Sequence, residues 1–199
     1  MENNSRGPEP GLALTKANRW LFAALAAALV YSLLALRLAF RLPYLVQDDA
    51  RQHIFWMRRY LDPKLFPNDL IADYFQAIAP AGYKTLYWIF AKLGVDPMLL
   101  AKLLPAAIGF TCVYLAFRVF MELMPDPRAA FISSVLVCEM IWFKDDVISA
   151  TPRAFSSLLF LLFLLFFLRR SMILCLIALS LEGLFFPPGM LISLGVLVL

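Results

Sequence analysis

The sequence has few charged residues and a single histidine. Asp, Glu, Lys and Arg make up 16% of its 199 residues, whereas soluble domains contain about 25%. It contains no glycine-rich phosphate loop, no Cys/His spacing of a zinc site and no Gly-x-Ser-x-Gly motif. Its three cysteines, Cys112, Cys138 and Cys175, lie inside apolar segments, which argues against a disulfide framework or a metal site. The net charge of +4 is too small to indicate a nucleic-acid partner.

Apolar residues are abundant instead, and they occur in long blocks. They make up 62% of the chain, and the mean hydropathy is +0.78. A helix that crosses a membrane needs about 20 predominantly apolar residues. Segments that meet or approach this length lie at about residues 20–40, 98–121, 129–143 and 154–168, followed by a broken pair at 172–199. The sequence therefore predicts an all-α fold, namely a polytopic transmembrane helical bundle.

The two ends of the chain differ in character. Residues 1–15 are polar and rich in Pro and Gly, which predicts a disordered tail before a transmembrane domain at 16–199. The apolar run after Arg19 is long for a signal peptide and lacks a clear small-residue cleavage site, so we expect a retained first span. The chain stays apolar up to Leu199, which favours the N-terminal part of a longer membrane protein.

Basic residues at the edges of the apolar blocks favour a cytoplasmic N-terminus in a multi-pass protein of the inner (plasma) membrane. The segments on the cytoplasmic side would hold Arg6, Lys16, Arg19, Arg128, Arg169 and Arg170. The loop at residues 41–97 would then be external, although it is also rich in Lys and Arg. Long loops count less toward orientation, and basic residues there are also suited to an anionic ligand.

The external loop is expected to carry amphipathic interfacial helices. Residues 49–61 combine apolar side chains with Trp56 and Tyr60, which predicts a helix on the membrane surface. Arg58 and Arg59 in this helix are expected to contact lipid headgroups. A second short helix would begin after Asn68 or Asp69, and an aromatic helix at about 79–94 would lead into the second span.

Two adjacent aspartates, Asp48 and Asp49, stand where the first of these helices begins. They can serve as the helix N-cap and a favourable first-turn charge. They can also form a carboxylate site just outside the membrane, in which one aspartate acts as a general base. The two interpretations are compatible. His53, four residues after Asp49, is either a hydrogen-bonded interfacial residue or a catalytic or metal-binding one.

Candidate residues also occur later in the chain. Arg153 closes a short polar loop that begins at Lys144, and it can bind a phosphate bidentately or anchor the chain among headgroups. Glu139 lies within the third predicted span, and Glu182 lies where residues 182–189 break the last apolar block. Ionisable residues inside a membrane are functional candidates, although each can also pair with a buried arginine.

The order of these features resembles the N-terminal portion of the GT-C glycosyltransferases. A first span is followed by adjacent acids, then amphipathic helices, a Pro-x-Gly-Tyr stretch at residues 80–83 and an aromatic helix before the second span. Within that class the chain looks most like the lipid A aminoarabinose transferase and the protein O-mannosyltransferases. The resemblance implies a polytopic enzyme that takes a sugar from a polyprenyl-phosphate donor.

The resemblance also implies roles for single residues. Asp48 falls on the family's catalytic aspartate, Asp49 replaces a glutamate and Arg51 falls on an arginine. The family's lysine before the Pro-Gly-Tyr stretch is Ala79 here, so Lys84 or Arg153 would have to replace that phosphate contact. A further departure lies in the second external loop, where Thr151 precedes Pro152 in place of an acid and Asp145 and Asp146 lie upstream.

The resulting hypothesis is sugar transfer to an acceptor at the outer face of the membrane. Asp48 would deprotonate or orient the acceptor, and Asp49 would assist through its charge or through a divalent metal. The other candidate substrate-binding residues are Arg51, His53, Tyr83, Lys84, Arg153 and Glu182. The alternatives are a flippase or transporter of lipid-linked sugars, which would use the broken segment and Glu139 or Glu182, and a non-catalytic membrane subunit.

Overall fold

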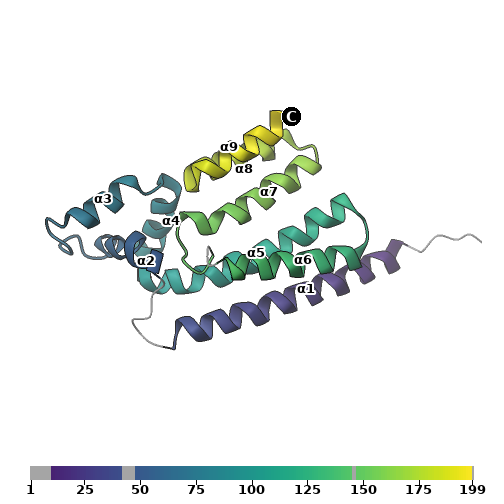
Figure 1. The fold of residues 1–199 in the computed structure, drawn as a ribbon, viewed down its shortest axis with the longest axis horizontal. Helices are drawn as coiled ribbons and strands as arrows, with labels where there is room; N and C mark the ends of the chain where they lie inside the picture. The colour runs from purple at the N-terminus through teal and green to yellow at the C-terminus, as the bar shows by residue number, and fades with distance from the viewer. Residues whose placement is uncertain (1–9, 42–47, 145–146, 199) are drawn as a thin grey trace, which may run out of the picture.

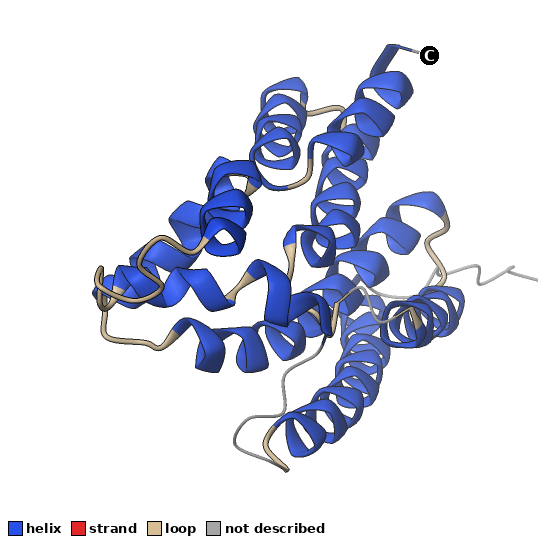
Figure 2. Cartoon of the chain, turned by 60° about the vertical axis from the view of Figure 1, so that its left-hand side comes forward, coloured by secondary structure: helices blue, strands red, loops and turns tan. Residues whose placement is uncertain are grey.

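The computed structural model describes residues 10–41, 48–144 and 147–198, without the side chains of residues 10–16 and 48. Within these ranges every regular element is a helix, and Figure 2 shows only helices and loops. The all-α prediction is confirmed.

The long helices run alternately up and down the molecule (Figure 1). Helices α1 (Pro10–Ala39), α5 (Pro97–Leu123) and α6 (Pro127–Phe143) pack on one another. Helix α7 (Ser156–Leu168) packs on α5, α8 (Met172–Phe185) on α7, and α9 (Pro187–Val198) on α8. The result is a bundle with two ends, one closed by tight turns and the other carrying the longer connections.

Local sequence signals define where α5 and α6 begin. The side chains of Asp96 and Asp126 cap these helices by accepting hydrogen bonds from the backbone N–H groups of Met98 and Arg128, at 2.7 and 3.0 Å. A proline follows each cap in the first helical turn, where its missing N–H costs nothing. The turn between the two helices is therefore held to residues 124–126, at the closed end of the bundle.

Small side chains allow α1, α5 and α6 to approach closely. The core between them contains Ala24, Ala28, Val113, Phe117, Ala130 and Cys138, all buried. A Cβ atom added at Gly109 in α5 would lie 2.8 Å from the Trp142 ring in α6. Helices packed in this way rely on small residues at the contact, a pattern common in membrane bundles.

Two of the described helices are long and apolar enough to cross a membrane, namely residues 17–39 of α1 and Pro97–Leu123. Helix α6 has 17 residues, and α7, α8 and α9 have 13, 14 and 12. At about 1.5 Å per residue the shorter helices span about 18–26 Å, less than the roughly 30 Å of a bilayer's hydrocarbon core. The described helices thus give two candidate spans and several shorter apolar helices.

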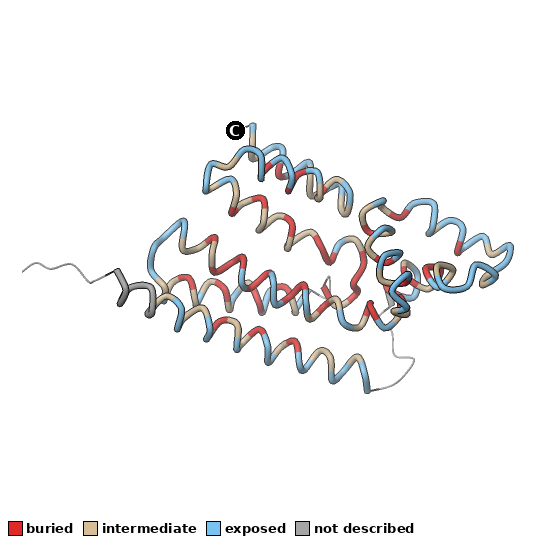
Figure 3. Tube along the Cα trace, turned by 180° about the vertical axis from the view of Figure 1, so that it is seen from behind, coloured by how far each residue is buried: buried red, intermediate tan, exposed pale blue. Residues whose placement is uncertain are grey.

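The outer faces of these helices are apolar. Figure 3 shows buried residues facing the interior of the bundle and exposed ones facing outward. Large apolar side chains are exposed at helical spacing on α1 (Leu29, Leu33, Leu34, Leu38), on α6 (Ile132, Leu136, Met140) and on α8 (Ile173, Leu176, Ile177). Apolar surface of this extent is unusual on a soluble monomer and suggests association with a membrane.

The prediction of one helix on the membrane surface at residues 49–61 is wrong in two respects, the type of helix and the surroundings of its apolar side chains. The structure has a short helix α2 (Asp48–His53) followed by a 3-10 helix η1 (Phe55–Tyr60). The side chains of Ile54, Trp56 and Met57 are completely buried in the main core. They fill space beneath α4 (Ala81–Lys92) and the start of α5, because burial within the protein satisfies an apolar side chain as well as lipid does.

Other boundaries also differ from the prediction. Helix α1 already begins at Pro10, so residues 10–15 are helical, and residues 1–9 lie outside the described part. The break predicted at 182–189 narrows to Phe186, with Glu182 inside α8. The reason is that Pro187 occupies the first turn of α9, where proline is tolerated, and Gly183 is accommodated within α8.

Candidate active site at the open end of the bundle

Three segments that are distant in the sequence meet at the open end of the bundle. The Tyr87 hydroxyl in α4 donates a hydrogen bond to the backbone carbonyl of Ala150 at 3.1 Å. The rings of Phe155 and Phe185 lie 4.8 Å apart, and α4 also packs on α8. Figure 1 shows α2, α3 (Leu70–Ile78) and α4 beside the starts of α5 and α7. The two polar loops and the α8–α9 connection therefore share one end of the molecule.

This arrangement brings Arg153 close to the first loop. Burial lowers the pKa of His53, the negative charge of Asp49 acts to raise it, and the positive charge of Arg153 acts to lower it further. Both charges therefore lie within electrostatic range of the imidazole, although Arg153 is 100 residues further along the chain. Arg153 belongs to the 3-10 helix η2 (Pro152–Phe155), which Pro152 begins.

The imidazole of His53 is half-buried and fixed by an aromatic contact. Its ring packs edge-on against the Phe75 ring of α3, with centroids 5.0 Å apart and an interplanar angle of 75°. Asp49 and Arg51 are exposed on α2, and each interacts with a neighbouring group. Asp48 is the first residue of α2, which agrees with the predicted start of this helix, but its side chain lies outside the described part.

The two α4 candidates occupy different surroundings. Tyr83 is completely buried, with its ring 5.0 Å from that of Tyr87 and 6.3 Å from that of Phe155. Burial raises the pKa of Tyr83 well above its ordinary value. Lys84 points the other way, and its ammonium donates to the backbone carbonyl of Gln76 at 3.3 Å. Tyr83 therefore belongs to the floor beneath the site, and Lys84 joins α4 to α3.

Glu182 is buried between α8 and α9, and only 2% of its surface is exposed. Its Oε1 accepts a hydrogen bond from the Ser193 hydroxyl at 2.9 Å. Its Oε2 is buried and has no hydrogen-bond partner among the residues that the structure describes. The expected arginine partner is thus replaced by a serine on the next helix. Glu139 lies outside this region, where its Oε1 accepts from the Tyr31 hydroxyl at 3.3 Å.

An apolar cavity of about 250 Å³ separates parts of α1 and α5. Small side chains open it, including Ala35 and Ala39 of α1 and Ala101 and Ala106 of α5. Ala50 of α2 and Ile148 line it as well, so the cavity reaches the open end next to Asp49. Lys102 supplies a cationic group to its wall, with the ammonium 5.2 Å from the centroid of the Phe40 ring. We name this cavity the α1–α5 groove.

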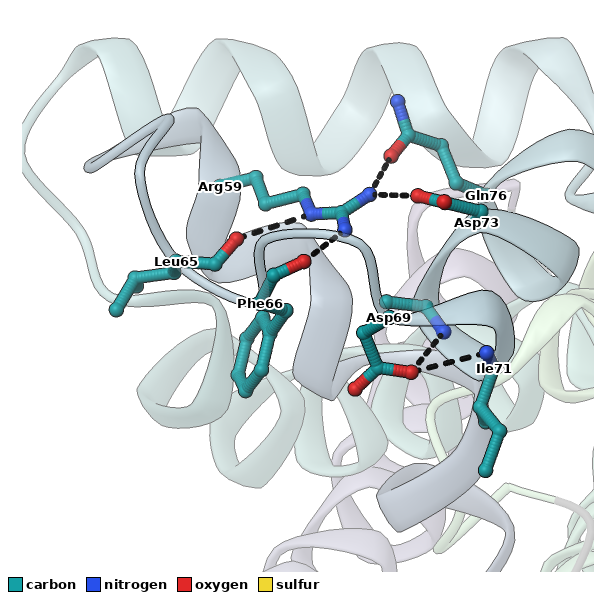
Figure 4. A network of polar contacts seen from close by, with 8 residues as sticks. Arg59, Leu65, Phe66, Asp69, Ile71, Asp73 and Gln76 are labelled. Carbon is teal, nitrogen blue, oxygen red and sulfur yellow. Dashed lines mark hydrogen bonds and ion pairs between the residues drawn. The ribbon is translucent and has the colours of Figure 1, made fainter.

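Arg59 of η1 joins the loop at residues 61–69 to α3 (Figure 4). Its guanidinium donates to the carbonyls of Leu65 and Phe66 at 3.2 and 2.5 Å, and to the side chains of Asp73 and Gln76 at 2.6 and 2.9 Å. These contacts hold a loop in which Phe66 has a positive φ of 55°. The expected contact of Arg59 with lipid headgroups is therefore wrong.

Arg58 differs from its neighbour in exposure. It forms a 3.1 Å ion pair with Asp96, the residue that caps α5, and half of its side chain is exposed. The pair ties η1 to the start of the second candidate span. Arg58 is thus also engaged by the protein, although its exposure leaves room for a headgroup contact.

The described side chains contain no group of three His, Cys, Asp or Glu residues close enough to hold a metal ion. The side chain of Asp48 and all of Asp145 and Asp146 lie outside that set. A divalent metal beside Asp49 therefore remains a prediction.

Comparisons with protein-family models, with curated proteins and with solved structures gave no match. The function proposed for this chain therefore rests on the geometry of the open end of the bundle.

Proposed function

We propose that this chain is the N-terminal part of a membrane glycosyltransferase of the GT-C type, which transfers a sugar from a polyprenyl-phosphate donor to an acceptor at the outer membrane face. The observation that supports this proposal most directly is the α1–α5 groove. It is apolar along its length and reaches the open end beside Asp49 of α2. A lipid-linked donor needs this combination, because its chain is apolar and its reacting end is charged.

The proposed donor would lie with part of its isoprenoid chain in the groove. The side chains that line the groove are apolar apart from Lys102, and burying apolar surface contributes about 25 cal/mol per Å². The phosphate would then sit near the mouth of the groove, within reach of cationic side chains. Lys102, Arg51 and Arg153 are the candidates there, since cations stabilise the negative charge of a phosphate leaving group.

In the proposed reaction, an acceptor hydroxyl attacks the anomeric carbon of the sugar. A bond from the acceptor oxygen to that carbon forms while the bond from the carbon to the phosphate oxygen breaks. The departing polyprenyl phosphate keeps the bonding electron pair, and the acceptor proton passes to the carboxylate of Asp48. Asp49 would add negative charge that favours proton uptake by its neighbour. His53, whose pKa is lowered by burial, would be neutral at pH 7 and able to accept a hydrogen bond.

The proposal places the bundle across the membrane with the open end outside. Apolar outer faces on α1, α6 and α8 support this placement. The closed end carries Arg19, near the start of the candidate span in α1, Arg128 after the turn at 124–126, and Arg169 and Arg170 in the turn at 169–171. Basic residues concentrate on the cytoplasmic side of membrane proteins, so the N-terminus would be cytoplasmic. The shorter helices α7, α8 and α9 would complete a multi-pass bundle.

The experiment that tests the proposal compares wild type with Asp48→Asn in the host cell, using the complete protein. Surface glycans and lipids are measured by mass spectrometry at matched protein levels. Loss of one glycan in the variant supports sugar transfer, and base catalysis predicts a rate loss of about 10²–10⁴-fold. Asp62→Asn is the matched control, because this exposed aspartate only accepts a hydrogen bond from the Lys64 N–H in the outer loop. An unchanged glycan profile in Asp48→Asn would contradict the catalytic role of Asp48 and leave it only the role of a helix cap.

A second candidate function is the transport of lipid-linked sugars, and the buried Glu182 favours it. A carboxyl oxygen without a hydrogen-bond partner among the described residues, between two apolar helices, is suited to binding a proton or a substrate group. The same host assay separates the two functions. Loss of the glycan in Glu182→Gln, with Asp48→Asn unaffected, would favour the transporter. If neither variant changes any glycan, the remaining hypothesis is a non-catalytic membrane subunit.

A further inference from the structure

A second cavity lies at the closed end of the bundle, opposite the candidate active site. Its volume is about 570 Å³. It is lined by Arg19, Trp20 and Ala23 of α1 and by Asp126, Pro127 and Arg128 at the start of α6. Two arginines from separate helices therefore face one space.

Several other arginines of the described chain are held by partners within the protein. Arg59, Arg169 and Arg118 donate to Asp73, Glu122 and Tyr114, respectively. The guanidinium groups of Arg19 and Arg128 are exposed and make no hydrogen bond or ion pair with any residue that the structure describes. Two guanidinium groups at one cavity repel each other, and an anion between them relieves that repulsion.

The remaining lining residues define the kind of anion. The Trp20 ring is held 5.2 Å from the ring of Phe131, which gives the cavity a fixed aromatic wall. Asp126 contributes one negative charge, and its Oδ1 is occupied by the N–H of Arg128 at 3.0 Å. Two arginines and one aspartate leave a net charge of +1, which matches the single charge of a phosphodiester. The second oxygen of Asp126 is suited to accept from a hydroxyl next to that phosphate.

We propose that this cavity binds the phosphoglycerol headgroup of a membrane lipid, with its phosphodiester held between Arg19 and Arg128. Guanidinium groups bind phosphate bidentately, and tryptophan is enriched at the depth of lipid headgroups. The lipid source rests on the proposed insertion in a membrane, but it does not depend on glycosyltransferase activity. The site would tie residues 19–23 of α1 to the start of α6, at the end of the bundle away from the candidate active site.

The test is native mass spectrometry of the purified chain in detergent, titrated with phosphatidylglycerol. Diacylglycerol with the same acyl chains shows whether the phosphate is needed, and glycerol 1-phosphate shows whether a soluble phosphate is enough. Arg19→Gln and Arg128→Gln are each expected to weaken phosphatidylglycerol binding about tenfold, equivalent to about 1.4 kcal/mol. The double variant is expected to lose less binding free energy than the sum of the two single losses, because both arginines hold one phosphate.

The matched control is the pair Arg37→Gln and Arg41→Gln, which removes two exposed arginines from the other end of α1. Unchanged lipid binding in this control, together with the loss in the cavity variants, supports the site. The proposed site would be overturned if the control pair lost as much phosphatidylglycerol affinity as the cavity pair. It would also be overturned if the losses of Arg19→Gln and Arg128→Gln were additive, because both results indicate unspecific headgroup contacts. Equally tight binding of diacylglycerol or of glycerol 1-phosphate would overturn the lipid phosphodiester as the ligand. Circular dichroism at matched concentration verifies that each variant is folded.

Discussion

The hydroxyl of Tyr87 and the backbone carbonyl of Ala150 form a buried hydrogen bond of 3.1 Å between residues 63 positions apart. Neither residue has any exposed surface. Ala150 adopts a positive φ of 50°, which non-glycine residues rarely do. The bond thus holds a strained turn at the position that leads into Pro152 and Arg153. Arg153, whose positive charge acts on the pKa of His53, lies just after this turn.

Replacing Tyr87 with phenylalanine tests how much this bond stabilises the fold. Tyr87→Phe leaves a buried carbonyl without its donor, which costs about 1–3 kcal/mol of unfolding free energy. Denaturant titration of the purified chain in detergent measures the loss. Tyr114→Phe is the control, because this exposed hydroxyl only accepts from Arg118 at 3.2 Å. Equal stabilities of the two variants would show that the buried bond contributes nothing to the fold.

Close packing of α4 against α8 gives a second prediction. A Cβ atom at Gly82 would lie 2.9 Å from the Cβ of Leu184 and 2.8 Å from the Phe185 ring. Gly82→Ala should therefore destabilise the chain by about 1–3 kcal/mol through overpacking. Gly195→Ala in α9 provides the contrast, because nothing lies within 4 Å of an added Cβ there and alanine favours a helix. Thermal unfolding of both variants measures the difference. A higher unfolding temperature of Gly82→Ala would contradict the close packing of Gly82 against α8.

The Arg59 network predicts that charge alone is not enough at this position. Arg59→Lys keeps the positive charge but cannot reach two carbonyls and two side chains at once, so we expect a loss of about 1.5–3 kcal/mol. The residue 61–69 segment should also become more sensitive to limited proteolysis. Arg58→Lys should change stability by less than about 0.5 kcal/mol, because lysine keeps the charge and the Arg58–Asp96 pair is partly exposed to solvent. Equal cleavage rates in the two variants would show that the hydrogen bonds of Arg59 do not hold this segment in place.

His53 permits a direct measurement of the charges at the site, because it is the only histidine and gives one imidazole resonance. An NMR pH titration of the wild type should show a pKa below the ordinary value of 6.5. Arg153→Gln should raise this pKa, and Asp49→Asn should lower it further. No change in Arg153→Gln would mean that the two side chains are not near each other in solution.

The same shift predicts how stability depends on pH. The folded pKa of His53 is lower than the unfolded one, so the unfolded state takes up the proton first as the pH falls. Stability is therefore complete above the unfolded pKa and declines as the pH falls from about 6.5 toward the folded pKa. His53→Gln should remove this part of the pH dependence in denaturant titrations.

Much of the fold could be predicted from the sequence. The long apolar blocks predicted the helices, and Asp69 caps α3 as expected, accepting from the N–H groups of Ile71 and Ala72 at 2.9 and 3.1 Å. These features depend on neighbouring residues, which a sequence shows directly. The surroundings of η1 could not be predicted, because Trp56 and Met57 would show the same pattern against lipid as against the protein core.

The contacts of the candidate site were only partly predictable. The pairing of Glu182 with Ser193 crosses from one helix to the next, and no local pattern marks it. The α1–α5 groove arises from alanines on two helices that are adjacent only in the fold. The four hydrogen bonds of Arg59, two to the loop at residues 65–66 and two to α3, also require the tertiary structure. The sequence identified which residues are chemically suitable, and the fold determines which of them meet.

The turns at residues 124–126 and 169–171 are short, whereas at the other end of the bundle the connections from α1 to α5 and from α6 to α7 are long and only the α8–α9 connection, at Phe186, is short. Short turns fix the relative height of the helices they join, so a change in length there would shift α5 against α6 or α7 against α8. The connections at the open end join helices whose positions are already set by packing and by those turns. Residues can be inserted or deleted around α3 or before η2 without moving the bundle. Chains that share this fold would therefore differ in length in the α1–α5 and α6–α7 connections, and the two turns at the closed end would stay constant in length.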